Sequence, residues 1–346
     1  MFLAIETSCD DTCAAVLTAE GRPLANVVSS QLVHEEYEGV VPELASREHL
    51  RLGLTVIRLA LEQAGCDLAA IRGIAVTQGP GLIGCLLVGL GLAKGLALAR
   101  GLPVIGVNHI EGHLHAILAE RQWSPPFVAL VASGGHTELL HVVGWGSYRL
   151  LGATRDDAAG EAFDKVAKLL GLGFPGGPVV DQRACSGRTD AFPFPRAYLD
   201  MEKGELDFSF SGLKTAVKLF LERHPDWNSG RAPDGFVEDV CASFQAALVD
   251  VLIAKLEAAV RQTGVRRILL SGGVACNSYL RQRAKALGEL VGAEVAYPAP
   301  PLCADNAVMI GLAALGRLIA GGDDGMSLSA RTNLDEFPGF ADRVVG

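Results

Sequence analysis

The chain of 346 residues exceeds the length that one hydrophobic core usually serves, so the sequence predicts two domains. Hydrophobic residues make up 49% and charged residues 20%, a balance that excludes a disordered chain. The net charge of −9 argues against tight binding of nucleic acid by this chain alone, because such affinity depends on lysine and arginine contacts to phosphate. Eight cysteines without paired spacing, and a start without a basic segment, predict reduced thiols in a cytoplasmic protein.

Short apolar strands alternate with small or polar turns in the first third of the chain. Residues 2–5 are expected to form a strand that enters ETSCDDT and returns over 13–17 as a hairpin, followed by a helix at 41–64. Residues 71–76 lead through TQGPGLIG into an apolar helix at 81–99. Its lysine, its glycines and the preceding strand favour a buried crossover helix over a membrane span.

The motif HIEGHLH follows, in a predicted helix over 108–120. His109 and His113 then lie four residues apart on one face, which suits two ligands of one metal ion but also arises by chance. Glu111 lies on the opposite side of the helix, so it cannot act on a metal-bound water as the glutamate of zinc peptidases does. His115 points away for the same reason.

The same order of elements recurs in the second part of the chain. Residues 127–131 enter ASGGHT and return over 138–143, and residues 267–270 lead through SGGVACNSYL into another helix. The repeated order favours an internal duplication, with two α/β lobes around a nucleotide cleft whose glycine-rich turns suit anion binding. Further helices are expected at 161–170, 212–222, 234–263 and 306–320.

The predicted boundaries follow from this duplication. We expect residues 1–124 to form the first lobe, with 306–325 packing back on it, and residues 125–305 to form a second lobe that carries most of the nucleotide site. Residues 326–346 are expected to be a loose tail. The basic residues of the second lobe are interpreted as solvated helix faces; they are Arg261, Arg266, Arg267, Arg281, Arg283 and Lys285.

Several other polar residues could carry chemistry. Asp305 opens a helix in PLCADN, either as a third metal ligand or as a helix cap, and two imidazoles with one carboxylate suit Fe²⁺, Zn²⁺ or Mn²⁺. Asp10 and Asp11, at the first hairpin tip, could bind metal-phosphate, accept a proton or simply form a turn. In GFPGGPVVD a rigid turn precedes Asp181, which could contact a ribose.

Taken together, these motifs resemble the TsaD (YgjD, Qri7) family of tRNA threonylcarbamoyladenosine-forming enzymes, in its bacterial form. The resemblance covers nearly the whole chain and rests on eight segments in the same order. They are IETSCDDT, HIEGH, SGGHTEL, GEAFDKVAKLLGL, PGGP, FSFSGLKTAV, SGGVACNSYLR and LCADNAVMIG.

The resemblance implies the fold of the actin-like ATPase, sugar kinase and Hsp70 superfamily, with two ribonuclease-H-like lobes. It implies transfer of a threonylcarbamoyl group from L-threonylcarbamoyl-adenylate to N6 of adenosine 37 in ANN-decoding tRNAs, with release of AMP. The partners it implies are tRNA, an inactive paralogue, TsaB, and a small ATPase, TsaE. It implies no membrane.

Matching motifs carry the family's site residues over to this chain. His109, His113 and Asp305 would hold one divalent metal per subunit, Fe²⁺ or else Zn²⁺, and Asp11 would position the reaction or take a proton. The family commonly shows SCDET where this chain has SCDDT, so Asp11 reaches one methylene less far. The adenylate would be bound by Val131, Ala132, Ser133, Gly134, Gly135, Asp164, Gly177, Asp181 and Asn277.

Three other functions compete with this one. A kinase or ATPase of the same fold would bind ATP and Mg²⁺ and would have little need of a histidine pair. A metallopeptidase is opposed by the position of Glu111. A non-catalytic scaffold, such as the inactive paralogue, would lack the histidine pair, which this chain retains.

Overall fold

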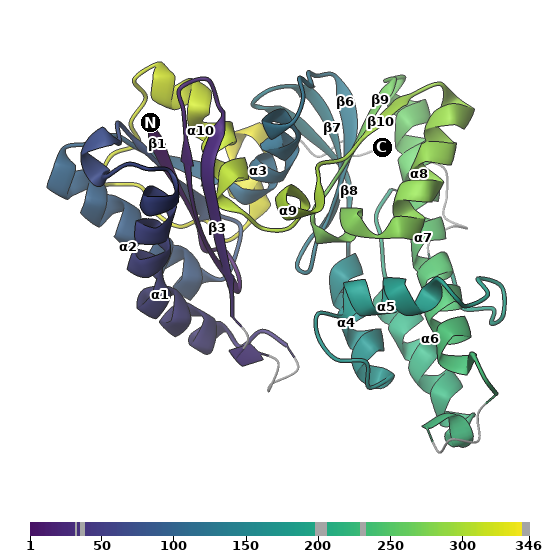
Figure 1. The fold of residues 1–346 in the computed structure, drawn as a ribbon. Helices are drawn as coiled ribbons and strands as arrows, with labels where there is room; N and C mark the ends of the chain where they lie inside the picture. Colours follow the sequence, from purple (N-terminus) through teal and green to yellow (C-terminus); the bar gives the residue numbers. More distant parts are fainter. Residues whose placement is uncertain (32, 35–38, 198–205, 229–232, 341–346) are drawn as a thin grey trace. The chain divides into compact units, whose positions relative to one another are not determined.

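The computed structural model describes residues 1–31, 33–34, 39–197, 206–228 and 233–340, and the chain divides into two compact units (Figure 1). Unit 1 comprises Met1–Trp123 and Pro298–Ala341, and unit 2 comprises chiefly Ser124–Tyr297. The chain thus returns to unit 1 at Pro298, earlier than the boundary at 305 expected from the sequence.

Unit 1 is built on a five-stranded mixed sheet with the order β3-β2-β1-β4-β5. The first three strands are antiparallel neighbours, whereas β1, β4 and β5 run parallel. The strands are β1 Phe2–Glu6, β2 Asp11–Leu17, β3 Pro23–Ser30, β4 Ile74–Gly79 and β5 Val104–Asn108.

Both faces of this sheet are covered, because alternate residues of a strand point to opposite faces. Leu3 and Ile5 pack with α1 (Pro42–Gln63) and α2 (Ile83–Arg100) in one apolar cluster. Ala4 packs with α10 (Ala307–Ile319) in the other. Since both faces are buried around the central strand, β1 is apolar over its first four residues instead of alternating with polar residues.

Helix α2 joins the parallel neighbours β4 and β5 and is therefore a crossover helix. Among the described residues it is the one helix long and apolar enough, by length and composition, to cross a membrane. About a third of its apolar stretch (33%) is buried inside the protein. Its position between two paired strands is that of an ordinary α/β crossover.

Helix α3 (His109–His115) begins directly after β5 and packs against α10. Asn108 caps it, since its side-chain oxygen accepts hydrogen bonds from the amides of Ile110 and Glu111. Asn306 caps α10 in the same way through the amide of Met309. The remaining short elements of unit 1 are η2 Leu68–Ala70, η3 Ala116–Ala119, α9 Pro300–Cys303, η6 Leu334–Glu336 and η7 Pro338–Phe340.

Unit 2 repeats this plan with the sheet order β10-β9-β6-β7-β8. The strands are β6 Phe127–Ala132, β7 Thr137–Gly144, β8 Ser147–Ala153, β9 Arg267–Ser271 and β10 Glu294–Ala296. The helical elements are α4 Ala159–Leu169, α5 Gly176–Ala184, α6 Ser211–Glu222, η4 Pro225–Asn228, α7 Phe236–Thr263, η5 Gly273–Cys276 and α8 Ser278–Val291.

The two sheets share one topology. In each, the third strand of the unit lies at one edge and is followed by the second, first, fourth and fifth. In each, the first three strands are antiparallel and the last two run parallel to the first. This agreement confirms the duplicated α/β architecture that the repeated motifs predicted.

The C-terminal segment differs from the prediction. Residues from 326 were expected to be loose, but Leu328 is buried in unit 1. The amide of Arg331 donates to the carbonyl oxygen of Gln78 at 2.9 Å, and the Gln78 side chain donates to the carbonyl oxygen of Ser329 at 2.8 Å. Residues 328–331 are therefore held against unit 1, beside Gln78 of β4; residues 341–346 lie outside the described range.

Candidate functional site

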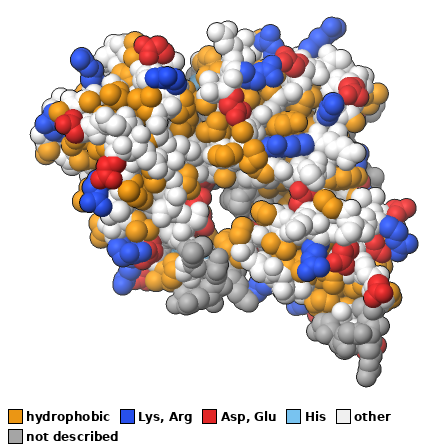
Figure 2. All heavy atoms as spheres, in the orientation of Figure 1, with side chains coloured by type: hydrophobic (Ala, Val, Ile, Leu, Met, Phe, Trp, Pro, Cys, Tyr) orange, Lys and Arg blue, Asp and Glu red, His pale blue; other side chains and the backbone are white. Residues whose placement is uncertain are grey.

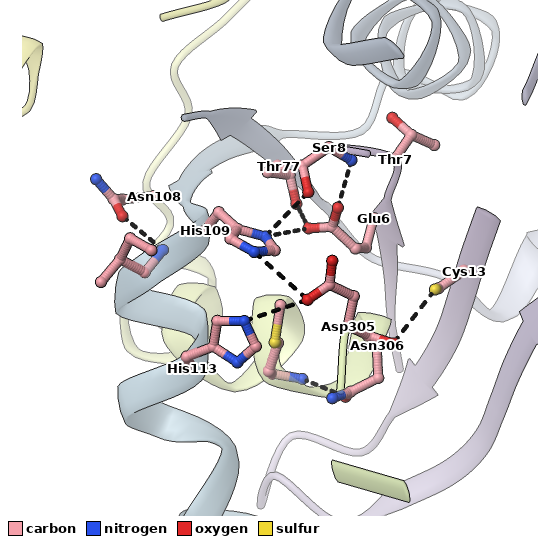
Figure 3. A network of polar contacts seen from close by, with 12 residues as sticks. Glu6, Thr7, Ser8, Cys13, Thr77, Asn108, His109, His113, Asp305 and Asn306 are labelled. Atoms are coloured by element: carbon pink, nitrogen blue, oxygen red, sulfur yellow. Dashed lines mark hydrogen bonds and ion pairs between the residues drawn. The ribbon is translucent and has the colours of Figure 1, made fainter. Parts of the chain in front are cut away.

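The structure brings His109, His113 and Asp305 together within unit 1 (Figure 3). Nε2 of His113 lies 3.2 Å from Oδ1 of Asp305, and Nε2 of His109 lies 3.5 Å from the same oxygen. Both imidazoles are buried, whereas the Asp305 side chain is 21% exposed. The cluster thus has one side that solvent or a ligand can reach.

The packing of two helices creates this cluster. The histidines lie on α3 and Asp305 precedes α10, so close approach of these helices determines their distance. Gly112, between the histidines, faces α10, where an added Cβ atom would lie 2.9 Å from Cδ1 of Ile310. A larger residue there would have to displace the side chains of Ile310 and Met309, which pack between the two helices.

The donor set fits a divalent transition metal. Its three candidate ligand atoms, two imidazole nitrogens and a carboxylate oxygen, lie within 4.8 Å of one another. This combination suits Fe²⁺, Zn²⁺ or Mn²⁺ and leaves coordination positions open for substrate oxygens. His115 lies outside the set, because its Nδ1 contacts the carbonyl oxygen of Glu111 at 2.8 Å.

Glu6, at the end of β1, is a site residue that the sequence did not indicate. Its Oε2 lies 3.0 Å from Nδ1 of His109, and its oxygens accept hydrogen bonds from the amide of Ser8 and the hydroxyl of Thr77. Burial alone would raise the pKa of this carboxyl, but its electrostatic attraction to the His109 imidazole and their hydrogen bond hold that pKa below its ordinary value. The sequence feature that could have indicated Glu6 is a carboxylate at the end of an apolar strand.

Asp11 is the first residue of β2 and is half-buried. Burial raises the pKa of its carboxyl to about 7; a hydrogen bond with Ser30 opposes this rise, and the charges of Asp305 and Asp10 add to it. A carboxyl with such a pKa exchanges protons near neutrality, which suits a general base.

The candidate adenylate residues lie at the carboxyl ends of the unit 2 strands and on α4, α5 and the start of α8. Val131 and Ala132 end β6, and the carbonyl oxygen of Ser133 accepts a hydrogen bond from the amide of Gly160. Gly272 has a φ of 86° and would carry a Cβ atom against the carbonyl oxygen of Ala132. Only glycine combines this φ with such close approach of the two turns.

Asp164 and Asp181 are tied into the second lobe by hydrogen bonds. Oδ1 of Asp164 accepts from the amide of Gly176 at 2.7 Å, next to Gly177 at the start of α5. The Asp181 carboxylate accepts from the side chain of Asn277 at 3.2 Å and from the hydroxyl and amide of Ser278 at 2.8 and 3.0 Å. The structure therefore brings Asp181 and Asn277 together.

Gln245 on α7 is a further polar residue that the sequence reasoning missed. It is buried, and its Oε1 accepts a hydrogen bond from Nδ2 of Asn277 at 2.8 Å. With Asp181 it accounts for the donors of the Asn277 amide, whose oxygen caps α8 through the amide of Leu280. The sequence feature that could have indicated Gln245 is a single glutamine within an apolar stretch of a long helix.

The chain is similar to proteins of one tRNA-modifying family. A family model described as "TsaD: tRNA N6-adenosine threonylcarbamoyltransferase" matches residues 22–312. A curated tRNA N6-adenosine threonylcarbamoyltransferase of Trichlorobacter lovleyi is 52% identical over 332 residues, which covers 95% of each chain.

Solved structures of other proteins share the fold. HypF of T. kodakarensis matches 94% of this chain and 49% of its own with a TM-score of 0.59 at 16% identity. The activator of the 2-hydroxyisocaproyl-CoA dehydratase of Clostridium difficile matches 92% of this chain and 96% of its own with a TM-score of 0.54 at 13% identity. These similarities confirm the actin-like ATPase fold predicted from the sequence.

Proposed function

Because the chain belongs to the TsaD family of tRNA N6-adenosine threonylcarbamoyltransferases, we propose that it transfers the threonylcarbamoyl group of L-threonylcarbamoyl-adenylate to N6 of adenosine 37 in ANN-decoding tRNAs. The products would be the modified tRNA and AMP. The acyltransferase activity on tRNA is that of its near full-length relatives. The observation that carries the proposal is the buried cluster of His109, His113 and Asp305.

These three residues would hold the metal, which we propose to be Fe²⁺, with Zn²⁺ as the alternative. When bound there, a divalent cation would stabilise the negative charge that develops on phosphate and carbonyl oxygens during transfer. A kinase of the same fold is not favoured, because the relatives are threonylcarbamoyltransferases and a kinase would have little need of two imidazoles.

The residues of unit 2 would bind the adenylate. The amides of Gly134 and Gly135 can donate to phosphate oxygens, whereas the Ser133 amide already donates to the carbonyl oxygen of His136 at 2.8 Å. Asp164, Gly177, Asp181 and Asn277 would contact the nucleoside. The hydrogen bonds between Asp181 and Asn277 support this assignment, since they fix both side chains before a ligand arrives.

Asp11 would take the proton of the attacking amine. The N6 lone pair forms the bond to the carbamoyl carbon, the bond from that carbon to the phosphate oxygen breaks, and AMP leaves with the electron pair. The proton released from N6 passes to the Asp11 carboxylate. The raised pKa of Asp11, about 7, supports this role, because a weaker base would hold the proton poorly.

We propose that the chain works in the cytoplasm with a paralogue of the TsaB type and a TsaE-type ATPase. Leu50 and Leu54 on α1 and Ile83 and Leu87 on α2 are 52–69% exposed, and the two helices pack on each other. Hydrophobic side chains are visible on this part of the surface in Figure 2. A paralogue of the same fold would present a corresponding helix pair, and a four-helix contact would then bury this face.

The proposed transfer is tested by supplying L-threonylcarbamoyl-adenylate and unmodified tRNA, with the partners, and measuring the modified nucleoside by mass spectrometry. Wild-type protein should form it, and His113→Ala should reduce the rate at least 100-fold. His224→Ala is the matched control, because His224 is exposed just beyond the C-terminal end of α6 and should leave the rate unchanged. Wild-type protein that forms no product with its metal site loaded would contradict the proposal.

A further inference from the structure

Glu6 is a completely buried carboxylate for which the proposed transfer has no direct use. Figure 3 shows it at the end of β1, with its oxygens directed at Ser8, Thr77 and His109. The amide of Ser8 donates to Oε1, and the hydroxyl of Thr77 and Nδ1 of His109 both contact Oε2. A buried carboxylate is tolerated only where such contacts replace its hydration.

These contacts constrain the proton on His109. A backbone amide can only donate, so Oε1 of Glu6 is an acceptor, and an ionised carboxylate accepts at Oε2 as well. Nδ1 of His109 then carries the imidazole proton and can share it with the Ser8 hydroxyl oxygen, which lies 3.2 Å away. Nε2 is left with its lone pair, and it is Nε2 that lies 3.5 Å from Oδ1 of Asp305.

We propose that Glu6 is a positioning residue that fixes His109 in the Nδ1–H tautomer and thereby keeps Nε2 available to a divalent metal. This inference rests on the proposed metal site. A carboxylate that holds the distal nitrogen of a ligating histidine sets both its tautomer and its ring orientation. Thr77 and Ser8 in turn hold Glu6, so β1, β4 and α3 each contribute to the geometry of one ligand.

Glu6→Gln tests this tautomer directly, because glutamine has nearly the same shape but only one acceptor oxygen. If that oxygen still accepts from the Ser8 amide, the new amide group faces His109 and donates to Nδ1. The imidazole proton then moves to Nε2, which can no longer bind a metal. Thr77→Val is the matched control: it also removes a hydrogen bond from Glu6, but it introduces no donor toward His109.

The first measurement is the tautomer of His109 in the full-length, metal-free protein, read by long-range ¹H–¹⁵N correlation at alkaline pH. We expect Nδ1–H in the wild type and in Thr77→Val, and Nε2–H in Glu6→Gln. A wild-type His109 protonated on Nε2 would overturn the proposal, and this result does not depend on whether any variant folds.

The second measurement is the affinity for Zn²⁺ alone, by competition with a chromophoric chelator. Glu6→Gln should bind about 10–100-fold more weakly than the wild type. Thr77→Val, which keeps the Glu6 carboxylate as an acceptor, should weaken binding less than Glu6→Gln does. Equal affinities of Glu6→Gln and wild type would refute the role of Glu6 and leave the metal site intact. Wild-type protein that binds no Zn²⁺ or Fe²⁺ would instead refute the metal site itself.

Discussion

At the scale of single residues, the site combines side chains that are unusual where they lie. Glu6, His109 and His113 are polar and buried, and Asp11 has a carboxyl pKa near 7. Groups whose pKa values are shifted in this way cluster at functional sites, because burial and neighbouring charges are what give them reactivity.

Replacing Asp11 should change both the rate of transfer and its dependence on pH. The wild-type rate is expected to rise with pH around pH 7, where the Asp11 carboxyl loses its proton. Asp11→Asn should lower the rate about 100-fold or more and abolish that rise, since general bases contribute about 10²–10⁴-fold. Asp11→Glu should retain activity, because glutamate supplies the same carboxylate one methylene farther from the backbone. Single-turnover rates across pH measure both effects; an unchanged pH profile in Asp11→Asn would exclude Asp11 as the base.

The same carboxyl should affect stability with a definite sign. Its pKa is raised in the folded state, so the folded protein holds the proton more tightly than the unfolded chain does. Stability is therefore lost as pH rises from about 3.8 through about 7. Asp11→Asn should raise the free energy of unfolding by about 2 kcal/mol above pH 7. This gain is smaller than the full pKa shift implies, because the side chain is partly exposed to solvent. Below pH 3.8 the substitution should not change the free energy of unfolding. Urea unfolding at both pH values checks this; a gain of equal size at both would contradict it.

At the scale of elements, the sequence predicted the strand and helix positions that have a clear period. Helices α6 and α10 lie within about one residue of their predicted bounds, and the His109–His113 spacing correctly placed both rings on one face. The edge strands β3 and β8 were missed, because their one-sided contacts produce no continuous apolar run. Helix α5 was read as a turn, since its first residues are Gly176, Gly177 and Pro178; proline is tolerated in a first helical turn.

Which distant residues come together at the site could be predicted only in part, because their proximity depends on packing between elements far apart in the sequence. A resemblance pointed to Asp305, but nothing near residue 305 shows that α10 lies against α3. Glu6 was missed for the same reason: the sequence gives no sign that β1 ends beside β4 and α3. Hydrogen bonds such as that from Asn277 to Gln245 also join residues whose spacing carries no signal.

Gly112→Val should separate α3 from α10 and weaken the metal site. The added side chain would meet Ile310 and Met309, and such overpacking costs about 1–3 kcal/mol. We expect a lower free energy of unfolding and at least tenfold weaker Zn²⁺ binding. Gly91→Ala on α2 is the control, since nothing lies within 4 Å of its Cβ position, and it should be neutral or stabilising by about 0.5–1 kcal/mol. Zn²⁺ affinity unchanged in Gly112→Val would show that the helix contact does not set the ligand distances.

At the scale of the whole molecule, the proposed contact with a paralogue involves the exposed apolar face of α1 and α2. Leu54→Glu with Leu87→Glu should abolish association with a TsaB-type paralogue, measured by sedimentation, because buried unpaired carboxylates would oppose the contact. Leu290→Glu, on a leucine of unit 2 that is also highly exposed (71%), should leave association unchanged. If both the double variant and Leu290→Glu still associate with the paralogue, or if both fail to associate, the assignment of the contact to α1 and α2 is contradicted.

The central claim is that the cluster of His109, His113 and Asp305 holds a divalent metal that the transfer requires. The most direct measurement compares metal content per chain with single-turnover formation of the modified nucleoside, in wild-type protein stripped by a chelator and then supplied with graded Fe²⁺ or Zn²⁺. Product should rise in proportion to bound metal up to one ion per chain, and Asp305→Asn should neither retain the ion nor recover activity. Full transfer by the metal-free wild type would contradict the account.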